Sequence, residues 1–154
     1  MEIILGDLDN PQVLDLLKRH LEGMHESSPP EHVHALSISA LKKPEISFWT
    51  LQKAGLVMGC GALKFLGDSH GEIKSMRTHS DYLRQGVAAK ILDHIISEAR
   101  HRNYSHLSLE TGTTSEFMPA LNLYSKYGFK MEAPFGDYTD NAFSQFMHLN
   151  LGAA

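Results

Sequence analysis

The sequence lacks long apolar runs and an excess of basic residues. Its 154 residues contain no apolar run long enough to cross a bilayer, so the sequence predicts no transmembrane helix and no membrane partner. Residues 1–5 also lack the basic start and the small-residue cleavage site of a signal peptide, which favours a cytoplasmic protein. The formal net charge is -4, and without a broad basic field we expect no nucleic-acid partner.

Cysteine is scarce as well, because Cys60 is the only one. A single cysteine excludes an internal disulfide and a cysteine-rich metal site. Its position between two glycines, with no assignable histidine partner, favours a buried strand cysteine over a nucleophile. His25, His32 and His34 cluster in the sequence, but no carboxylate or cysteine spacing around them is typical of a metal site. We therefore expect no metal ion.

Apolar residues make up 42% of the chain, and their periodicity predicts a single α/β domain over residues 1–154. Strand-like patterns cover residues 1–6, 46–52, 56–66, 72–78, 105–111 and 145–151, with a further short strand near 129–132. Helical patterns lie between some of these strands. The predicted order is β-α-α-β-β-β-α-β-α-β, a mixed central sheet of six to seven strands with helices on both faces.

Four helices are expected between the strands. The first begins at Pro11 with Asn10 as its cap and ends at the break over residues 27–30. Its apolar stripe is expected at Val13, Leu14, Leu17 and Leu21. The second helix is expected over residues 31–42 and the third over residues 87–99. The fourth carries the apolar face of residues 117–124 and ends near Gly128.

The segment Tyr82–Ala89 joins a predicted strand to the third helix. A turn of this kind directs several backbone N–H groups toward one point at the positive end of a helix, and that geometry binds phosphate oxygens. Gly86 and the two small residues after it allow a ligand to approach the main chain closely. The sequence therefore predicts a cofactor that carries phosphate. The chain has neither a Gly-Lys-Ser/Thr motif nor a Rossmann fingerprint near an early strand, which argues against other nucleotide-binding folds.

Two segments together resemble the GNAT superfamily of acyl-CoA-dependent N-acetyltransferases. The first is Glu72-Ile73-Lys74-Ser75-Met76 followed by Arg84-Gln85-Gly86-Val87-Ala88, and the second is Leu123-Tyr124-Ser125-Lys126-Tyr127-Gly128-Phe129. The predicted order of elements agrees, so the resemblance extends over residues 3–151. Residues 28–31, 59–63 and 109–112 also look like a bacterial subgroup of general GNAT enzymes. The resemblance implies the GNAT acyl-CoA N-acyltransferase fold.

The resemblance implies acetyl-CoA as the co-substrate. Its pyrophosphate is expected on the backbone N–H groups of the segment Arg84, Gln85, Gly86, Val87, Ala88 and Ala89. Backbone groups of Met76 and Thr78 are expected to bind the pantetheine arm. The chain departs from the family at Leu83, where Gln or Arg is usual, and at Phe117, where many members have an Asn that contacts the cofactor. Asn122 is the expected replacement for that contact.

The resemblance also implies transfer of the acetyl group to a primary amine by direct attack. Tyr124 is then the general acid that protonates the departing thiolate. Glu72 and Glu110 are the candidates for the base, because a carboxylate is rarely buried on a central strand unless it has a partner or a function. For either residue alone, a structural pair with Lys74 or Arg77 is the competing interpretation.

Two further questions stay open from the sequence. The acceptor is an amine on a small molecule, a peptide or a protein, and the chain carries no decisive pattern for it. An alternative function is a CoA-binding sensor or interaction module that has the fold but little turnover, for which the departures at Leu83 and Phe117 argue. Dimers are common in the family, so a homodimer is also open.

Overall fold

The computed structural model describes residues 1–27 and 36–152. Within these residues, seven strands form one sheet in the order β1-β2-β3-β4-β5-β7-β6. They are β1 (Glu2–Leu5), β2 (Ile46–Lys53), β3 (Leu56–Gly67), β4 (His70–Thr78), β5 (His106–Gly112), β6 (Lys130–Met131) and β7 (Ser144–Asn150). Neighbouring strands are antiparallel except β4 and β5, which are parallel. The predicted mixed sheet is confirmed, including the short strand before the last.

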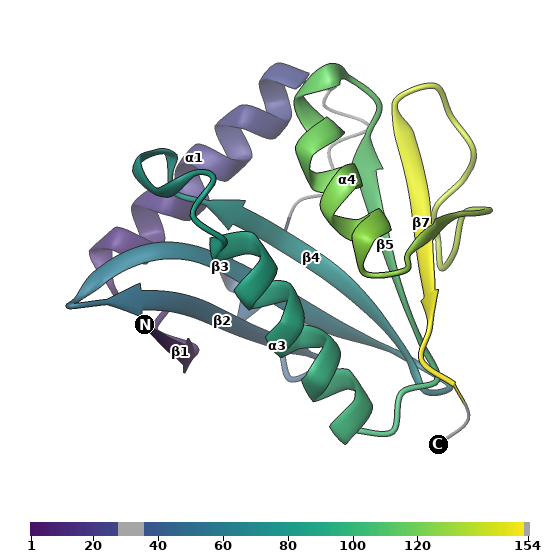
Figure 1. Cartoon of the computed structure of the whole chain (residues 1–154), viewed down its shortest axis with the longest axis horizontal. Helices are drawn as coiled ribbons and strands as arrows, with labels where there is room; N and C mark the ends of the chain where they lie inside the picture. The colour runs from purple at the N-terminus through teal and green to yellow at the C-terminus, as the bar shows by residue number, and fades with distance from the viewer. Residues whose placement is uncertain (28–35, 153–154) are drawn as a thin grey trace.

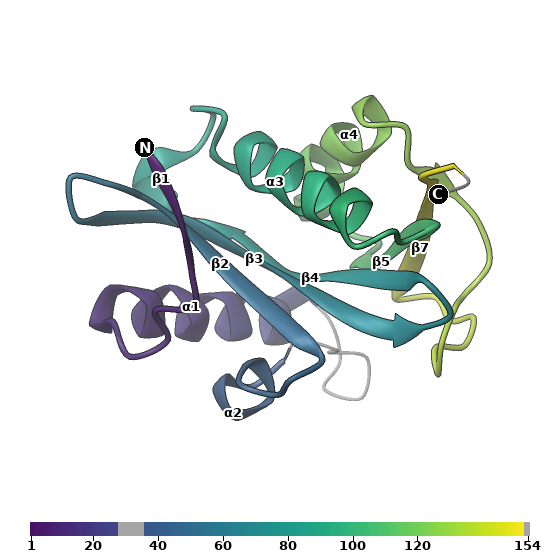
Figure 2. The same cartoon turned by 90° about the horizontal axis from the view of Figure 1, so that it is seen from below.

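Helices cover both faces of the sheet, as predicted (Figure 2). On one face lie α3 (Val87–His101) and α4 (Met118–Lys126), and on the other lie α1 (Pro11–Ser27) and the short α2 (Ile38–Leu41). Single 3-10 turns, η2 (Ser80–Tyr82) and η3 (Ser115–Phe117), precede α3 and α4. Figure 1 shows α4 beside β5 and β7, and α3 crossing the sheet next to it.

The beginning of α1 follows the sequence, since the Asn10 side chain accepts a hydrogen bond from the N–H of Gln12 at 2.9 Å. The predicted apolar stripe was partly wrong. The fully buried side chains of α1 are Val13, Leu16, Leu17 and His20, whereas Leu14 and Leu21 are only half-buried. The helix is thus rotated, which brings a histidine to the sheet.

The second helix is shorter than predicted within the described residues. Ser37 is extended and caps α2 by accepting a hydrogen bond from the N–H of Ala40 at 3.2 Å, so the helix starts after it. Pro44 follows shortly after its last residue, and proline cannot continue a helix. The segment 28–31 and the histidines His32 and His34 lie outside the described residues.

A bulge in β4 changes the direction of that strand. Cys60 of β3 is opposite Arg77, and Ala62 is opposite Lys74. An interval of two residues on β3 therefore lies opposite an interval of three residues on β4. Ser75 takes up the extra residue with a φ of +56°, which is unusual for a residue other than glycine. Such bulges bend a strand and often lie beside active sites.

Strands β4 and β5 separate beyond the bulge. Their parallel pairing extends only from His70 with His106 to Ile73 with Leu109. Both strands continue, to Thr78 and to Gly112, and Figure 1 shows them diverging. The edge of β4 that faces β5 therefore has no strand partner over its last residues, and its backbone groups are open to a ligand.

Candidate active site

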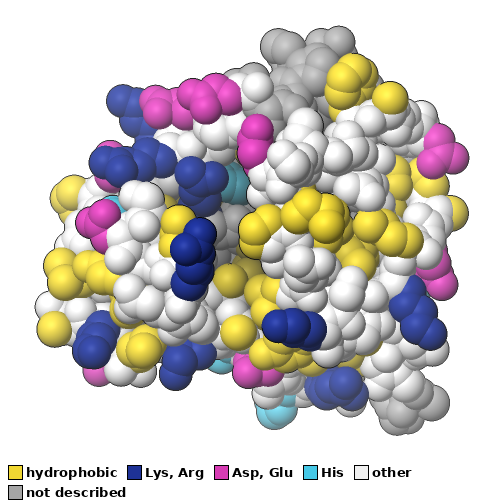
Figure 3. Space-filling view, turned by 45° about the horizontal axis from the view of Figure 1, so that its top comes forward, with side chains coloured by type: hydrophobic (Ala, Val, Ile, Leu, Met, Phe, Trp, Pro, Cys, Tyr) yellow, Lys and Arg dark blue, Asp and Glu magenta, His cyan; other side chains and the backbone are white. Residues whose placement is uncertain are grey.

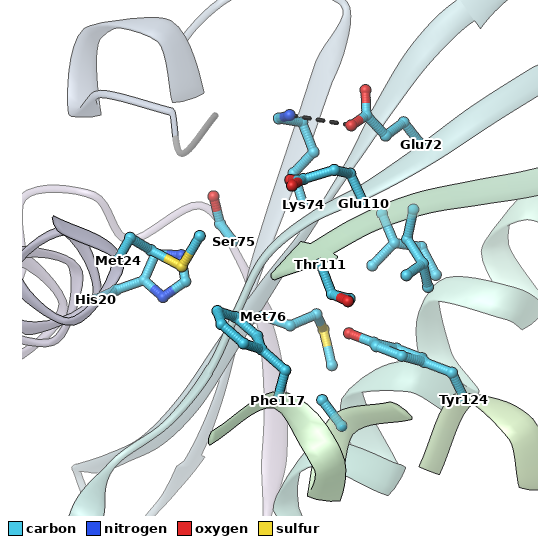
Figure 4. A pocket seen from close by; sticks show the side chains of 13 residues that line it. His20, Met24, Glu72, Lys74, Ser75, Met76, Glu110, Thr111, Phe117 and Tyr124 are labelled. Atoms are coloured by element: carbon cyan, nitrogen blue, oxygen red, sulfur yellow. Dashed lines mark hydrogen bonds and ion pairs between the residues drawn. The ribbon is translucent and has the colours of Figure 1, made fainter. Parts of the chain in front are cut away.

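A cavity of about 100 Å³ lies where β4 and β5 separate. Figure 4 shows that it has two sides. Tyr124 lies on one side with Thr111, Met76 and Phe117, and its hydroxyl is directed into the cavity toward Thr111. Toward α1 lie His20, Met24 and Ser75. The charged residues Glu72, Lys74 and Glu110 line the cavity further along the strands.

Tyr124 comes from α4, and only 5% of the residue is exposed. Its ring packs edge-on against Phe129 at 5.6 Å between centroids, which fixes its direction. The hydroxyl makes no hydrogen bond to any described residue. Burial raises the pKa of Tyr124, so the phenol keeps its proton at neutral pH. The phenol can therefore donate its proton to a group that binds in the cavity.

The carboxylate of Glu72 accepts hydrogen bonds from two neighbouring side chains. Its Oε2 accepts a hydrogen bond from Lys74 Nζ at 3.0 Å and another from the Tyr138 hydroxyl at 2.6 Å. Lys74 Nζ also donates to the Tyr138 oxygen at 2.9 Å. Burial and the Glu72 carboxylate both raise the pKa of Tyr138. The ion pair of Glu72 with Lys74, the competing interpretation from the sequence, is therefore present.

Glu110 differs from Glu72, because its carboxylate forms no ion pair with a described residue. Burial raises the pKa of Glu110. The Ser144 side chain and the charge of Lys74 partly oppose this rise, while the charge of Glu72 adds to it. A carboxylate with a raised pKa is a stronger base. Of the two predicted candidates, Glu110 therefore has the better electrostatic setting for accepting a proton.

The raised pKa of Glu110 predicts a stability effect. The carboxyl loses its proton more readily in the unfolded chain, so above the ordinary value of 4.5 ionisation favours unfolding. We expect Glu110→Gln to raise the melting temperature at pH 7 by about 2 °C, and the difference to disappear below pH 4.5. Thermal unfolding at both pH values measures it. Glu2→Gln on exposed β1 is the control, and a less stable Glu110→Gln protein at pH 7 would contradict the expectation.

The segment Arg84–Ala89 forms an exposed turn at the beginning of α3. Gly86 is its N-cap residue, with a φ of +78° and no capping side chain, and Arg84 also has a positive φ of 62°. None of the N–H groups from Arg84 to Ala89 donates a hydrogen bond to a described residue, whereas the carbonyl of Gly86 already accepts one from Lys90 at 3.1 Å. Free donors at a helix N-terminus form an anion site.

The space-filling view shows a hollow in the molecule near the centre of the face (Figure 3). Lys and Arg side chains lie along one side of the hollow, and hydrophobic side chains lie along the other. A long ligand with an anionic end and an apolar end matches this distribution.

The other predicted cofactor residues are placed as follows. Met76 lines the cavity, and Thr78 ends the part of β4 that has no partner on its β5 side. Asn122 is exposed on α4 and does not line the cavity. Leu83 is 56% exposed. Phe117 lines the cavity, and it fits because a Cβ at Gly112 would overlap its ring.

Several lining or neighbouring residues were not predicted from the sequence, among them His20, Met24, Ser75 and Tyr138. His20 and Met24 lie one turn apart on α1, so they face the cavity together. A signal for them was present, because His20 follows Leu16 and Leu17 at helical spacing. Ser75 depends on the bulge and Tyr138 on a long loop, and neither leaves a pattern in the sequence.

Within residues 1–27 and 36–152, no helix is long and apolar enough to span a membrane. No group of three or more His, Cys, Asp or Glu side chains there is arranged to hold a metal ion. Cys60 is fully buried, its thiol donates to the Ser75 carbonyl at 3.3 Å, and burial raises its pKa to about 12. This setting disfavours a thiolate nucleophile.

A sequence model of the acetyltransferase (GNAT) family matches residues 10–129. The chain belongs to the GNAT family of acetyltransferases. It is 49% identical to the uncharacterized N-acetyltransferase YsnE of Bacillus subtilis over 147 residues, 96% of this chain and 97% of the relative. It is 46% identical to the uncharacterized N-acetyltransferase YedL of Escherichia coli over 145 residues, 94% and 91% of the two chains. The predicted family is confirmed, and with it an acetyltransferase enzyme.

The fold of this GNAT protein also matches solved structures. A Bacillus subtilis acetyltransferase in complex with CoA has a TM-score of 0.71 and 18% identity, and the match covers 97% of this chain and 98% of that one. At this identity the likeness shows the fold alone. The predicted GNAT fold is confirmed.

Proposed function

We propose that the protein transfers the acetyl group of acetyl-CoA to a primary amine by direct attack. The observation that carries this proposal is the shared cavity where β4 and β5 separate. The buried phenol of Tyr124 and the carboxyl of Glu110 both face it. Acetyl transfer to an amine needs a proton donor for sulfur and a proton acceptor for nitrogen, and the cavity offers one of each.

The co-substrate would be held by main-chain groups. The free N–H groups of the turn Arg84–Ala89 are the donors for its pyrophosphate. The unpaired edge of β4 around Met76 and Thr78 can accept and donate hydrogen bonds to the pantetheine amides, which resemble an extended peptide. A thioester at the end of such an arm would reach the cavity that contains Tyr124.

The reaction requires a neutral amine. A lysine-like amine has a pKa of about 10.4, so deprotonation at pH 7 costs about 4 to 5 kcal/mol. Glu110 would take this proton, directly or through a water molecule. The nitrogen then attacks the carbonyl carbon, a C–N bond forms and the C–S bond breaks. Tyr124 donates its proton to the departing thiolate, and the second proton that the nitrogen loses would restore the phenol through a water molecule. Glu72, already bonded to Lys74 and Tyr138, would shape the cavity instead.

The alternative is a CoA-binding sensor or interaction module with little turnover. Leu83 and Phe117 depart from the family pattern and favour it. The phenol of Tyr124, which lies in the cavity without a hydrogen-bond partner in the described chain, argues for turnover.

A thiol-release assay with acetyl-CoA and a panel of primary amines separates the two functions. The panel should include amino acids, polyamines, aminoglycosides and peptides with free N-termini. We expect release of CoA that depends on at least one amine, at a turnover of about 1 per second or more. Calorimetric binding of acetyl-CoA with no amine-dependent release across the panel would favour the sensor.

A further inference from the structure

Two buried polar atoms at the cavity have no hydrogen-bond partner among the described residues. They are Nδ1 of His20 and Oγ of Ser75. The two residues are 9% and 8% exposed, and both line the cavity on its α1 side (Figure 4). A buried polar group without a hydrogen-bond partner destabilises the fold. A ligand in the cavity that bonds to both groups would remove this cost.

The bulge places Ser75 on this side of the sheet. Cys60 and Ala62 face the α1 layer, where they belong to the cluster that contains Val13 and Leu17. Their partners on β4, Arg77 and Lys74, therefore face the same layer. Between them the extra residue, Ser75, keeps its side chain at the α1 side, as Figure 4 shows.

This side of the cavity is electropositive. Lys74 is one neighbour of Ser75. Its ammonium donates to Glu72 and Tyr138, which leaves a third proton to donate. Arg77 forms no ion pair with a described residue, and its guanidinium packs against Gly23 of α1, one turn from His20. The positive charge of Arg77, added to burial, lowers the pKa of His20 to about 4.

The carboxyl of Glu110, on β5, lines the same cavity. The charges of Glu72 and Lys74 cancel locally because they form an ion pair at 3.0 Å. What remains is a positive field from Arg77 beside Ser75 and His20, and a negative group at Glu110. This distribution is complementary to a zwitterion rather than to a simple cation or anion.

We propose that the acceptor is a small amino acid whose carboxylate binds at Ser75 and His20 and whose amine lies toward Glu110. This rests on the proposed function and names its substrate class. The Ser75 hydroxyl and the N–H of a neutral His20 imidazole donate to the carboxylate, and Arg77 supplies the compensating charge. The small volume of the cavity suits an acceptor of few atoms.

Matched pairs of acceptors test this proposal. The thiol-release assay compares glycine, L-alanine and L-serine with their primary amides, which have the same amine but no carboxylate. We expect kcat/KM for each acid to exceed that for its amide by at least about 10-fold. An α-amine beside an amide has the lower pKa and is more often neutral at pH 7, so any preference for the acid comes from the carboxylate.

Ser75→Gly tests the residue itself. Glycine adopts the φ of +56° without strain, so the change removes the hydroxyl and preserves the bulge. We expect the KM for the acids to rise about 10-fold, while the KM for acetyl-CoA and for the amides stays the same. Ser69→Gly is the control, because Ser69 has a φ of +59° in an exposed turn. His20→Gln should act in the same direction as Ser75→Gly.

The outcomes separate the two proposals. If no amine of any kind is acetylated, the proposed function fails. If amines are acetylated but acids and amides react equally well, or if polyamines or peptides react far better than both, the function stands and the amino-acid acceptor is overturned. An unchanged preference for acids in both Ser75→Gly and His20→Gln would also overturn the assigned carboxylate site.

Discussion

Gly86→Glu is expected to abolish the binding of acetyl-CoA. The new carboxylate would lie beside the free backbone N–H groups of the turn. At about 5 Å and an effective dielectric of about 20, each phosphate charge would meet a repulsion of about 3 kcal/mol. Placing a side chain at a φ of +78° also lowers the folding stability by about 1 to 2 kcal/mol, with or without the ligand. Affinity should fall by more than about 100-fold, measured by calorimetric titration with acetyl-CoA.

Gly55→Glu is a closely matched control for this change. Gly55 has a φ of +77°, and a Cβ at either glycine would meet no atom within 4 Å. Both variants therefore carry the same backbone strain and the same new charge, but Gly55 lies in the β2–β3 turn, away from the free N–H groups. Normal affinity in Gly55→Glu together with lost affinity in Gly86→Glu would assign the effect to the turn. Equal affinity in both variants would remove the phosphate site from the proposal.

The parts of the site that are continuous in sequence were predicted from it. The turn at Gly86 follows from a strand pattern, a glycine and a helical pattern in succession. Tyr124 was found because its motif extends through Gly128, whose φ of +95° ends the helix as expected. Local backbone geometry depends mainly on residues that are close in the sequence, so such features can be predicted from a single sequence.

The parts that depend on tertiary structure could not be predicted in the same way. Ser75 has an unusual backbone conformation because of a register shift between β3 and β4, and serine gives no sign of it. Tyr138 reaches Glu72 across 66 positions in the sequence. This contact distinguishes Glu72 from Glu110, which looked equivalent as strand carboxylates. The choice of base thus depends on a loop whose sequence has no pattern.

The fold explains why one cavity combines these groups. The bulge turns β4 away from β5, and the separation opens a passage between the α4 side and the α1 side of the sheet. Tyr124 faces this passage from one layer, and His20 faces it from the other. A reaction between two substrates that enter from opposite faces needs such an opening, because an intact sheet would keep them apart.

Tyr124→Phe is expected to lower the maximal rate by about 100-fold or more, since general acid catalysis contributes about that much. The affinity for acetyl-CoA should stay near normal, because the ring still packs against Phe129. The hydroxyl makes no hydrogen bond to a described residue, so its loss leaves no group unpaired there. We expect the variant to be at least as stable as the wild type in thermal unfolding. Rates are measured at saturating acetyl-CoA and amine.

Tyr127→Phe is the control within the same motif. The Tyr127 hydroxyl donates to the Ala89 carbonyl at 3.3 Å and lies outside the cavity. Its removal should change the rate by less than about 2-fold. Single-turnover measurements are needed as well, because slow product release would hide a change in the chemical step. If Tyr124→Phe transfers the acetyl group at the wild-type rate in a single turnover, Tyr124 does not protonate the thiolate, and a water molecule in the cavity becomes the proton donor to test.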